Sequence, residues 1–367
     1  MRILTVIGTR PQIIKAAMVS GELKKAGIGE TLLHTGQHYD ANMSQHFFEE
    51  LDLPLPAFNL DIHPEGHSTM TGRMIEGISA YIKKLNPDAV LVYGDCNSTL
   101  AGAIAAKQEK RVLIHIEAGL RSYRNNMPEE LNRVITDRIS DYLFCPTGQA
   151  CQNLQKEGFD LFDCRVIFSG DVMEDAAMYY SKIADQKSTL FEKYPDIQRG
   201  NYLLCTFHRE ENITNEQKLT DLCLALKELS AKYQVVMPLH PATRKQLANF
   251  NCRPEAYLLP PLGYLDMNVL TRNARMVITD SGGLQREAFF FHKFCAVLRE
   301  ETEWGELVEG GYSTLTGTQP SRLFRALETY EKRKFQKKHQ LFGGGNAAQK
   351  IAACLKEAEG LANQKLR

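Results

Sequence analysis

The sequence predicts an α/β protein with two doubly wound domains, each built on a parallel sheet. Short apolar runs recur along the chain, and each is followed by a turn and then by a helical pattern. Continuous apolar runs of this length are typical of parallel strands that are buried on both faces. The chain also has 367 residues, which is more than one hydrophobic core usually holds. Together these observations favour two domains of similar architecture.

The predicted strands fall into two groups. The first group comprises residues 2–7, 30–35, 88–93, 111–116, 141–145 and 165–170, and the second comprises 201–206, 234–239, 255–260, 275–279 and 294–298. Between the groups, residues 184–201 are polar, include Pro195 and Gly200, and show no strand pattern, so they are the expected linker. We therefore expect domains at 1–183 and 200–340, followed by an amphipathic C-terminal helix at 346–367.

Composition and charge exclude several classes of protein. Lys+Arg and Asp+Glu both number 44, so the net charge is zero and a broad surface for nucleic acid or an anionic membrane is not expected. No apolar stretch approaches the roughly 18 residues of a membrane span. The apolar run near the N-terminus is too short for a secretory signal and is interrupted at Gly8. The balance of charge still allows a local basic pocket.

The nine cysteines are scattered, and no CxxC pair occurs. Several of them, such as Cys205 and Cys295, lie inside apolar runs. This usage indicates reduced core thiols in a cytoplasmic protein rather than a disulfide framework or a zinc site. We expect no metal ion.

Ligands of open α/β sheets bind at the carboxyl ends of strands, so the turns after the strands are the first place to seek a site. The turn after strand 2–7 carries Gly8, Arg10 and Lys15. A guanidinium fork and an ammonium group suit a phosphate or carboxylate, and the glycine permits close approach. The alternative is a surface turn with solvated cations.

Acidic residues follow two further strands of the first domain. Asp95 comes just after strand 88–93, where it is either a functional acid or the cap of the next helix. Glu117 stands directly at the end of strand 111–116, where capping explains it less well. Glu129 and Glu130 follow Pro128 at a helix start, where the alternative role is interaction with the helix dipole.

The second domain carries a histidine and a glycine-rich turn. His208 follows strand 201–206 and is either an acid–base group or a core residue. Strand 275–279 leads into a turn containing Ser281, Gly282 and Gly283, whose backbone N–H groups at a helix start suit a diphosphate. The alternative is a tight turn that only caps the helix. Glu287, one turn further along, suits the hydroxyl pair of a ribose.

Neither a Walker motif nor a GxGxxG dinucleotide fingerprint is present, so hydride transfer through a nicotinamide cofactor lacks support. Trp304, the only tryptophan, is expected to be a packing residue or a ligand platform. The constellation predicts a nucleotide diphosphate held mostly by the second domain, with its reacting carbon facing the acids of the first. Several carboxylates and a histidine around one carbon suit proton abstraction and return.

The chain resembles the non-hydrolysing UDP-N-acetylglucosamine 2-epimerases over nearly its whole length. The resemblance is carried, in order, by the segments GTRPQIIK, TGQH, YGDCNSTLAG, HIEAGLRS, MPEELNR, FHREEN, PLHP and TDSGGLQREA. It implies two Rossmann-like domains with the active site in an interdomain cleft, as in GT-B glycosyltransferases. It also implies a homodimer without a metal or cofactor, whose products enter capsule, O-antigen or wall polysaccharides.

The reaction implied by this resemblance is elimination followed by re-addition. A base removes the proton at C2 of the sugar while UDP leaves C1, and a 2-acetamidoglycal forms. UDP then adds back, and C2 receives a proton on the opposite face. Two other classes of function remain: a GT-B glycosyltransferase and a non-catalytic sugar-nucleotide sensor.

The resemblance assigns roles motif by motif. Its catalytic carboxylates correspond to Asp95, Glu117 and Glu129, and its catalytic histidine to His208. Asp95 or Glu117 would handle the C2 proton, Glu129 would be the partner acid or base, and His208 would stabilise the departing diphosphate. The UDP-binding positions correspond to Arg10, Lys15, Arg133, Ser281, Gly282, Gly283 and Glu287.

Two departures from the common pattern bear on substrate and regulation. The usual TERPE motif is replaced by residues 302–306, TEWGE, which resembles the branch acting on UDP-2,3-diacetamido-2,3-dideoxy-glucuronate more than the UDP-N-acetylglucosamine enzymes. A uronate needs an extra cation, which Arg121, Arg124 or Arg299 could supply. A set resembling the family's activating UDP-N-acetylglucosamine site comprises Gln37, His38, Arg73, Arg209 and His240. Asp40, where many members have Gln, and a shortened loop before Pro128 argue against such activation.

Overall fold

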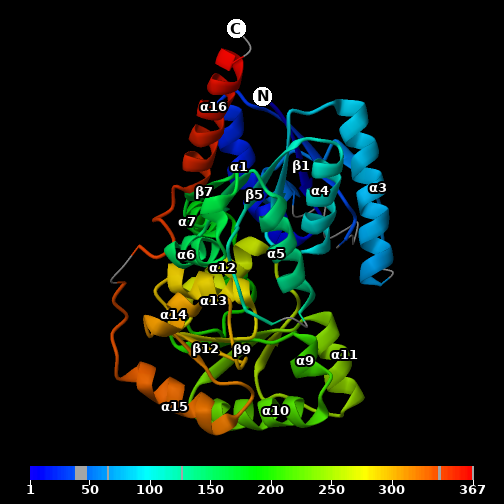
Figure 1. Ribbon diagram of the computed structural model, residues 1–367. Coiled ribbons are helices and arrows are strands. Elements are labelled where there is room, and N and C mark those ends of the chain that lie inside the picture. Colours follow the sequence, from blue (N-terminus) through cyan, green and yellow to red (C-terminus); the bar gives the residue numbers. More distant parts are fainter. Residues whose placement is uncertain (38–47, 64–65, 125–126, 338–339, 366–367) are drawn as a thin grey trace. The chain divides into compact units, whose positions relative to one another are not determined.

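The computed structural model describes residues 1–37, 48–63, 66–124, 127–337 and 340–365, and it confirms an α/β protein with two Rossmann-like domains (Figure 1). The chain forms two compact units. The first unit comprises Met1–Ala176 together with Gln340–Arg367, and the second comprises Ala177–His339. Each unit contains one parallel sheet with helices against its faces.

The first unit has a seven-stranded sheet in the order β3-β2-β1-β4-β5-β6-β7, with all pairs parallel. Each strand predicted for this half of the chain is present, and among the described residues the two-residue β3 is the one strand that was not predicted. The strands are β1 (Arg2–Ile7), β2 (Gly29–His34), β3 (Phe58–Asn59), β4 (Ala89–Tyr93), β5 (Val112–Ile116), β6 (Tyr142–Cys145) and β7 (Arg165–Phe168).

The helices of the first unit cover this sheet. Those beginning in it are α1 (Arg10–Lys25), α3 (His67–Leu85), α4 (Asn97–Gln108), α5 (Pro128–Ile139), α6 (Gly148–Lys156), η1 (Phe159–Leu161), α7 (Val172–Lys187) and α16 (Ala347–Lys365). Along α3, Met70, Met74, Ile78 and Ile82 recur every four residues and are all buried. This stripe lies on one helix face, where it joins the apolar core formed with α4 and β4.

The C-terminal helix belongs to the first unit. Figure 1 shows α16 (red) beside α1 (blue), and the two helices are in contact. Asp175 on α7 fastens the start of α16, since its carboxylate accepts hydrogen bonds from the backbone N–H groups of Ala347 at 3.0 Å and Ala348 at 2.8 Å. The predicted helix after residue 346 is thus present, packed on the first unit rather than standing as a part of its own.

The second unit has a six-stranded parallel sheet in the order β10-β9-β8-β11-β12-β13. Each predicted strand is again present, and β13 is additional. The strands are β8 (Tyr202–Thr206), β9 (Gln234–Pro238), β10 (Tyr257–Leu259), β11 (Met276–Thr279), β12 (Cys295–Val297) and β13 (Ser313–Leu315). The helices are α8 (Leu190–Lys193), α9 (Glu210–Ile213), α10 (Glu216–Ser230), α11 (Pro241–Asn249), α12 (Tyr264–Asn273), α13 (Gly282–Phe290), α14 (Gly305–Glu309) and α15 (Pro320–Glu331).

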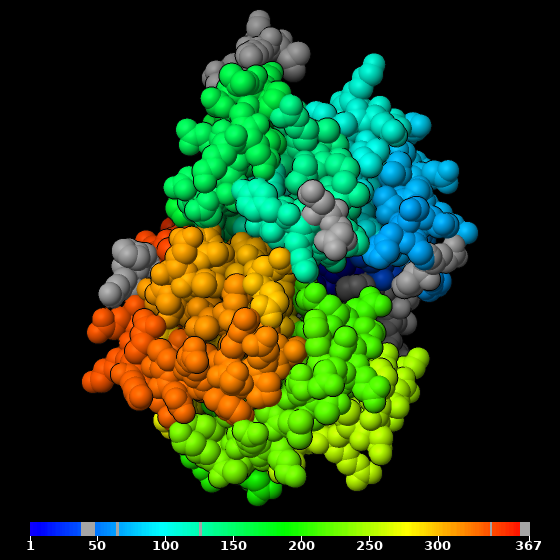
Figure 2. All heavy atoms as spheres, turned by 60° about the horizontal axis from the view of Figure 1, so that its bottom comes forward, coloured from blue at the N-terminus to red at the C-terminus, as the bar shows by residue number. Residues whose placement is uncertain are grey.

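Two amphipathic helices of the second unit, α10 and α15, pack side by side against one face of its sheet. In Figure 2 their outer sides meet as neighbouring green and orange surfaces. Their inner sides carry the buried leucines of the core, including Leu222 and Leu226 on α10 and Leu323 and Leu327 on α15. The apolar residues follow the three- and four-residue spacing expected of such helices.

The boundary between the units differs from the expected linker. Residues 184–201 contain the end of α7 and all of α8, and they belong to the second unit. Leu190 and Ile197 are buried, although the segment is otherwise polar. These two apolar side chains anchor the segment to the second unit. The mean composition of the segment is polar, so it does not reveal them.

Both sheets contain a point at which the strand order reverses. In the first sheet this point lies between β1 and β4, and in the second between β8 and β11. The carboxyl ends of strands on either side of such a point are the usual place for a ligand. The turns at these positions contain Gly8 and Asp95 in the first unit, and His208 and Ser281 in the second. No helix of the described residues is long and apolar enough to span a bilayer.

Candidate active site

The turn after β1 is tied to the end of β4 by the side chain of Gln12. Its Oε1 accepts hydrogen bonds from the backbone N–H groups of Gly8 at 2.8 Å and Thr9 at 3.2 Å, and its Nε2 donates to the carbonyl of Tyr93 at 2.8 Å. Gly8 has no room for a side chain, since a Cβ would lie 2.2 Å from Ser98 Oγ. The motif glycine therefore lets β1 approach α4.

Lys15 is buried and forms an ion pair with Glu117. The distance from its Nζ to Glu117 Oε2 is 2.6 Å, and the two side chains are 4 % and 10 % exposed. A Cβ added at Gly94 would lie 3.6 Å from Lys15 Nζ and from Glu117 Oε1, so the turn after β4 borders this pair. The alternative of a solvated cation on a surface turn is thus wrong for Lys15.

Glu117 adopts an unusual backbone conformation at the end of β5. Its φ is +72°, in the left-handed region that side chains other than glycine rarely occupy. The backbone N–H groups of Glu117 and Ala118 both donate to the carbonyl of Phe144 at 3.0 Å, which holds the turn in place. Strain of this kind persists only where the surroundings enforce it, and it concentrates at functional sites.

Asp95 is paired with Arg133 rather than with the helix that follows it. The N-cap of α4 is Cys96, and the Asp95 carboxylate accepts a bond from Arg133 Nη2. Arg133 Nη1 also donates to Glu130 Oε2 at 2.6 Å, so one guanidinium joins both acids. The structure therefore places Asp95 and Arg133 together.

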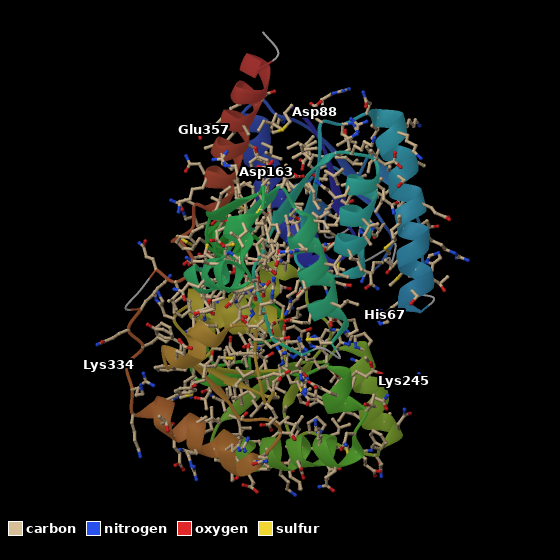
Figure 3. All side chains as sticks on the ribbon, in the orientation of Figure 1. His67, Asp88, Asp163, Lys245, Lys334 and Glu357 are labelled. Carbon is tan, nitrogen blue, oxygen red and sulfur yellow. The ribbon has the colours of Figure 1, made fainter. Side chains whose placement is uncertain are left out.

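An amide chain continues from the Asp95 turn to the start of α3. Asn132 Nδ2 donates to the carbonyl of Asp95 at 2.9 Å and lies 3.2 Å from Asn97 Oδ1. Asn97 Nδ2 in turn lies 3.0 Å from Nδ1 of His67, which is labelled in Figure 3. Asp88, at the opposite end of β4 from Asp95, is also labelled there and accepts a bond from the backbone N–H of Arg2 at 2.7 Å.

Glu130 stabilises the turn before α5 through hydrogen bonds, in addition to lying in the first turn of the helix. Its carboxylate accepts bonds from the backbone N–H groups of Ser122 and Tyr123, both at 2.9 Å, and from Ser122 Oγ at 2.8 Å. Burial would raise the pKa of Glu130, but these bonds and Arg133 outweigh burial and lower it. Glu129 lies half-buried in the first turn of α5 and takes part in neither the Asp95–Arg133 nor the Lys15–Glu117 pair.

Arg10 stands at the first position of α1 and is half-buried. Burial lowers its pKa, and the nearby charge of Glu50 acts in the opposite direction. The side chain thus lies at the start of a helix, beside the switch point of the first sheet.

A buried charge network behind these turns was not foreseen. Asp137 on α5 is fully buried and contacts His115 of β5. Arg121 donates a hydrogen bond to Asp137 at 2.7 Å. The Nε and Nη2 groups of Arg121 also donate to the carboxylate of Glu157, both at 2.7 Å. Burial would raise the pKa of Asp137, but His115 and Arg121 outweigh burial and hold it below its usual range. A sequence signal did exist, since His115 interrupts an otherwise apolar strand.

In the second unit, Asp280 organises the turn that carries His208. Its carboxylate is fully buried and accepts bonds from the backbone N–H groups of His208 at 3.0 Å and Arg209 at 2.9 Å, and from Asn212 Nδ2 at 3.0 Å. His208 Nδ1 lies 3.6 Å from Asp280 Oδ1, and its side chain is 42 % exposed. The ring is therefore accessible to a ligand while its backbone is fixed, which excludes the alternative of a core histidine.

The glycine-rich turn opens α13 on the other side of this switch point. Ser281 is the N-cap, and its Oγ accepts a bond from the backbone N–H of Leu284 at 3.4 Å. A Cβ at Gly282 would lie 2.2 Å from Glu303 Oε1, and Glu303 Oε2 accepts a bond from Arg299 Nη1 at 2.8 Å. Glu287 is half-buried in the same helix. Ser281, Gly282 and Gly283 thus form the N-terminal end of the nine-residue helix α13.

The residues proposed for an effector site are distributed over both units. In the first unit, Gln37 Oε1 accepts bonds from the backbone N–H of Ser98 at 3.0 Å and from its Oγ at 2.7 Å, and Arg73 is exposed on α3. His38 lies outside the described residues. In the second unit, Arg209 is the N-cap of α9, and His240 is the N-cap of α11 with its ring 5.4 Å from that of His208.

Two of the three arginines considered for a uronate do not suit that role. Arg121 is engaged by Asp137 and Glu157, and its side chain is 1 % exposed. Arg299 is paired with Glu303, and its side chain is 2 % exposed. Arg124 is partly exposed. Trp304 is buried, with the guanidinium carbon of Arg286 4.2 Å from its ring, so it is a packing residue.

All nine cysteines are free thiols. Cys145, Cys205, Cys223 and Cys295 are buried, whereas the others are partly exposed, so the expectation of core thiols holds for only part of the set. Burial raises the pKa of Cys205 and Cys295. Among the described ranges no three His, Cys, Asp or Glu side chains are grouped so that they could hold a metal ion.

The fold and the charged turns at both switch points define an α/β protein of the Rossmann-like, two-domain class. A sequence model of the family described as UDP-N-acetylglucosamine 2-epimerase matches residues 22–356. The UDP-2,3-diacetamido-2,3-dideoxy-D-glucuronate 2-epimerase of Pseudomonas aeruginosa is 44 % identical over 357 residues, which cover 97 % of this chain and 99 % of that protein. The chain therefore belongs to the UDP-N-acetylglucosamine 2-epimerase family.

Solved structures agree with this assignment. The crystal structure of Methanocaldococcus jannaschii UDP-GlcNAc 2-epimerase in complex with UDP-GlcNAc and UDP matches with a TM-score of 0.90 at 37 % identity, covering 97 % of this chain and 100 % of that one. A glycosyltransferase from Rickettsia africae matches with a TM-score of 0.53 at 14 % identity, covering 97 % of this chain and 92 % of that one. The second likeness concerns the fold alone.

Proposed function

We propose that this protein is a non-hydrolysing UDP-sugar 2-epimerase. The observation that carries the proposal is the pair of carboxylates on neighbouring turns of the first sheet, Asp95 and Glu117, each held by a cation on a helix. Carboxylates fixed in position in this way are common general bases. In the second unit, the start of α13 and the accessible His208 offer a hydrogen-bonding surface for a diphosphate.

The proposed reaction begins when one of these carboxylates takes the proton from C2 of the sugar. The electrons of the C2–H bond form the C1=C2 double bond, and the C1–O bond breaks to release UDP. Arg10 and His208 stabilise the negative charge that develops on the diphosphate. Glu129 is the proposed partner acid, which delivers a proton to the other face of C2 while UDP adds back to C1.

The proposed substrate is UDP-2,3-diacetamido-2,3-dideoxy-glucuronate, and UDP-N-acetylglucosamine is the second candidate. The similarity to the Pseudomonas enzyme and the TEWGE motif support the first. Since Arg121 and Arg299 are buried in ion pairs, Arg124 is the proposed partner of the C6 carboxylate. Assays with both UDP-sugars side by side distinguish the two.

Incubation in deuterated water tests the reaction itself. Deuterium at C2 of the recovered UDP-sugar supports an epimerase, transfer of sugar without exchange identifies a glycosyltransferase, and an unchanged ligand identifies a sensor. Asp95→Asn, Glu117→Gln, Glu129→Gln and His208→Ala should each lose about 100-fold or more in turnover while still binding UDP. Asp88→Asn is the matched control at the opposite end of β4, and near-normal rates in all four variants would reject the site assignment.

The resemblance further supports a cytoplasmic homodimer that needs no metal or cofactor and feeds polysaccharide synthesis. Light scattering of the purified protein tests the dimer, with a single 41.5 kDa species as the contrary result. Activity that disappears after treatment with a chelator and returns with a divalent metal would overturn the metal-free mechanism.

A further inference from the structure

His115 is a fully buried histidine whose two ring nitrogens both face oxygen acceptors. Nδ1 lies 2.7 Å from Asp137 Oδ1, and Nε2 lies 2.8 Å from the carbonyl oxygen of Gly94. A carbonyl oxygen has no proton to donate, so Nε2 must carry one. Asp137 also accepts from Arg121. The ring therefore bridges the Asp137 carboxylate and the carbonyl of Gly94.

The other oxygen of Asp137 holds the turn that follows Glu117. Asp137 Oδ2 accepts a hydrogen bond from the backbone N–H of Gly119 at 3.0 Å. This turn includes the strained backbone of Glu117, which needs fixed partners to persist. Arg121 returns to the same turn through its bond from Nη1 to the carbonyl of Leu120 at 2.7 Å. Asp137 is thus the common anchor of the segment.

A continuous hydrogen-bonded path joins the two turns that carry the acids. It runs from the turn after Glu117 through Gly119 N–H to Asp137, then through the His115 ring to the carbonyl of Gly94, the residue before Asp95. Each intermediate group is buried, so water does not compete for these bonds. The path thus adds a side-chain link behind the turns to the direct backbone bond from the N–H of Gly94 to the carbonyl of Ile116 at 2.9 Å.

We propose that Asp137 and His115 are positioning residues that help to fix the separation of the Asp95 and Glu117 carboxylates. This inference rests on the proposed epimerase function. Both side chains act through the turns and not by contact with the sugar. A displacement of about 1 Å at a reacting group can cost roughly 100-fold in rate, so the path matters for turnover more than for binding.

The first experiment measures kcat, KM and UDP affinity in His115→Gln and Asp137→Asn. We expect kcat to fall about 100-fold while KM and the dissociation constant for UDP change less than threefold. The matched control is Asp141→Asn, since Asp141 Oδ2 accepts from the backbone N–H of Leu113 at 2.7 Å, at the opposite end of β5. Equal losses of kcat in the control, or unchanged kcat in both variants, would overturn the proposal.

The second experiment needs no variant and so does not depend on folding of the mutants. Nitrogen-15 NMR of the wild-type protein, with His115 assigned by through-bond correlation, should show a proton on Nε2, which the bond to the Gly94 carbonyl requires. Nε2 without a proton would refute the path. C2 deuteration by the wild type is measured in parallel. If the wild type does not incorporate deuterium at C2, the epimerase proposal is wrong. If it does, and the His115 and Asp137 variants have unchanged kcat, only the positioning role is wrong.

Discussion

Lys15 Nζ lies 2.6 Å from Glu117 Oε2, which joins the first helix of the chain to the turn after the fifth strand. Between β1 and β5 in the sheet lies β4, whose following turn, at Gly94, borders the pair. Both side chains are almost inaccessible to water. If one of them were removed, water could therefore not solvate the charge of the other. Removal of one partner would leave a buried charge without compensation, which is more costly than removal of both.

A double-mutant cycle tests this coupling. Lys15→Met and Glu117→Gln should each lower the free energy of unfolding by about 3–5 kcal/mol, and the double variant should lose clearly less than the sum. Chemical denaturation measures all three. The control pair is Lys83 and Glu109, 3.2 Å apart with Lys83 68 % exposed, whose coupling should stay below about 1 kcal/mol. Coupling of the same size in both pairs would contradict the prediction.

The two glycines at the start of α13 should respond differently to a methyl group. Gly282→Ala would place a Cβ 2.2 Å from Glu303 Oε1 and disturb its bond with Arg299, so we expect a loss of about 1–3 kcal/mol in stability. At Gly283 the nearest atom to such a Cβ, Ser281 Oγ, is 3.8 Å away, which is ordinary contact. Thermal unfolding compares them, and equal destabilisation would show that this local geometry is not decisive.

Asp175 should make stability fall as the pH rises between about 4 and 6. Burial raises the pKa of Asp175 to about 6 in the folded protein, and the like charges of Asp171 and Glu174 add to this effect. Because the folded state retains the proton more strongly, the contribution of Asp175 is fully present below the ordinary pKa near 4. It is lost as the pH rises through 6, and a shift of two units is worth roughly 3 kcal/mol.

Asp175→Asn does not titrate, so it provides the comparison. The stability of the wild type relative to this variant should decrease by roughly 3 kcal/mol from pH 4 to pH 7. Asp137 and Glu130 have lowered pKa values and act with the opposite sign, but they are common to both proteins and cancel. Denaturation at several pH values measures the difference, and a constant difference would contradict the assignment.

Arg124→Gln should separate the two candidate substrates. We expect kcat/KM for UDP-2,3-diacetamido-2,3-dideoxy-glucuronate to fall roughly 10- to 100-fold, as for loss of a hydrogen bond to a charged group, and that for UDP-N-acetylglucosamine to change little. Arg138→Gln is the matched control, since its guanidinium carbon lies 3.6 Å from the centre of the Phe162 ring. An equal effect of Arg124→Gln on both substrates would assign Arg124 another role.

Most of the architecture followed from local pattern. Strands buried on both faces, such as β4 and β11, read as unbroken apolar runs, and each was predicted within two residues of its observed ends. The two-residue β3 was missed because two residues carry too little periodicity to stand out. The strand β13 is as long as β12, but its sequence STL contains two hydroxyl residues and does not read as an apolar run. The linker was misplaced for a related reason, since Leu190 and Ile197 anchor it as single buried side chains.

Local pattern along the chain was enough to predict the two-domain α/β fold and the turns on which chemistry-bearing residues stand, because apolar periodicity and turn residues are local properties. Which charges meet could be known only from the folded chain. In the folded chain Lys15 is buried against Glu117, and Arg121 pairs with Asp137 and Glu157. His115 lies behind both acidic turns. Ion pairing depends on distances of a few ångströms between residues far apart in the chain, and no local pattern encodes such distances.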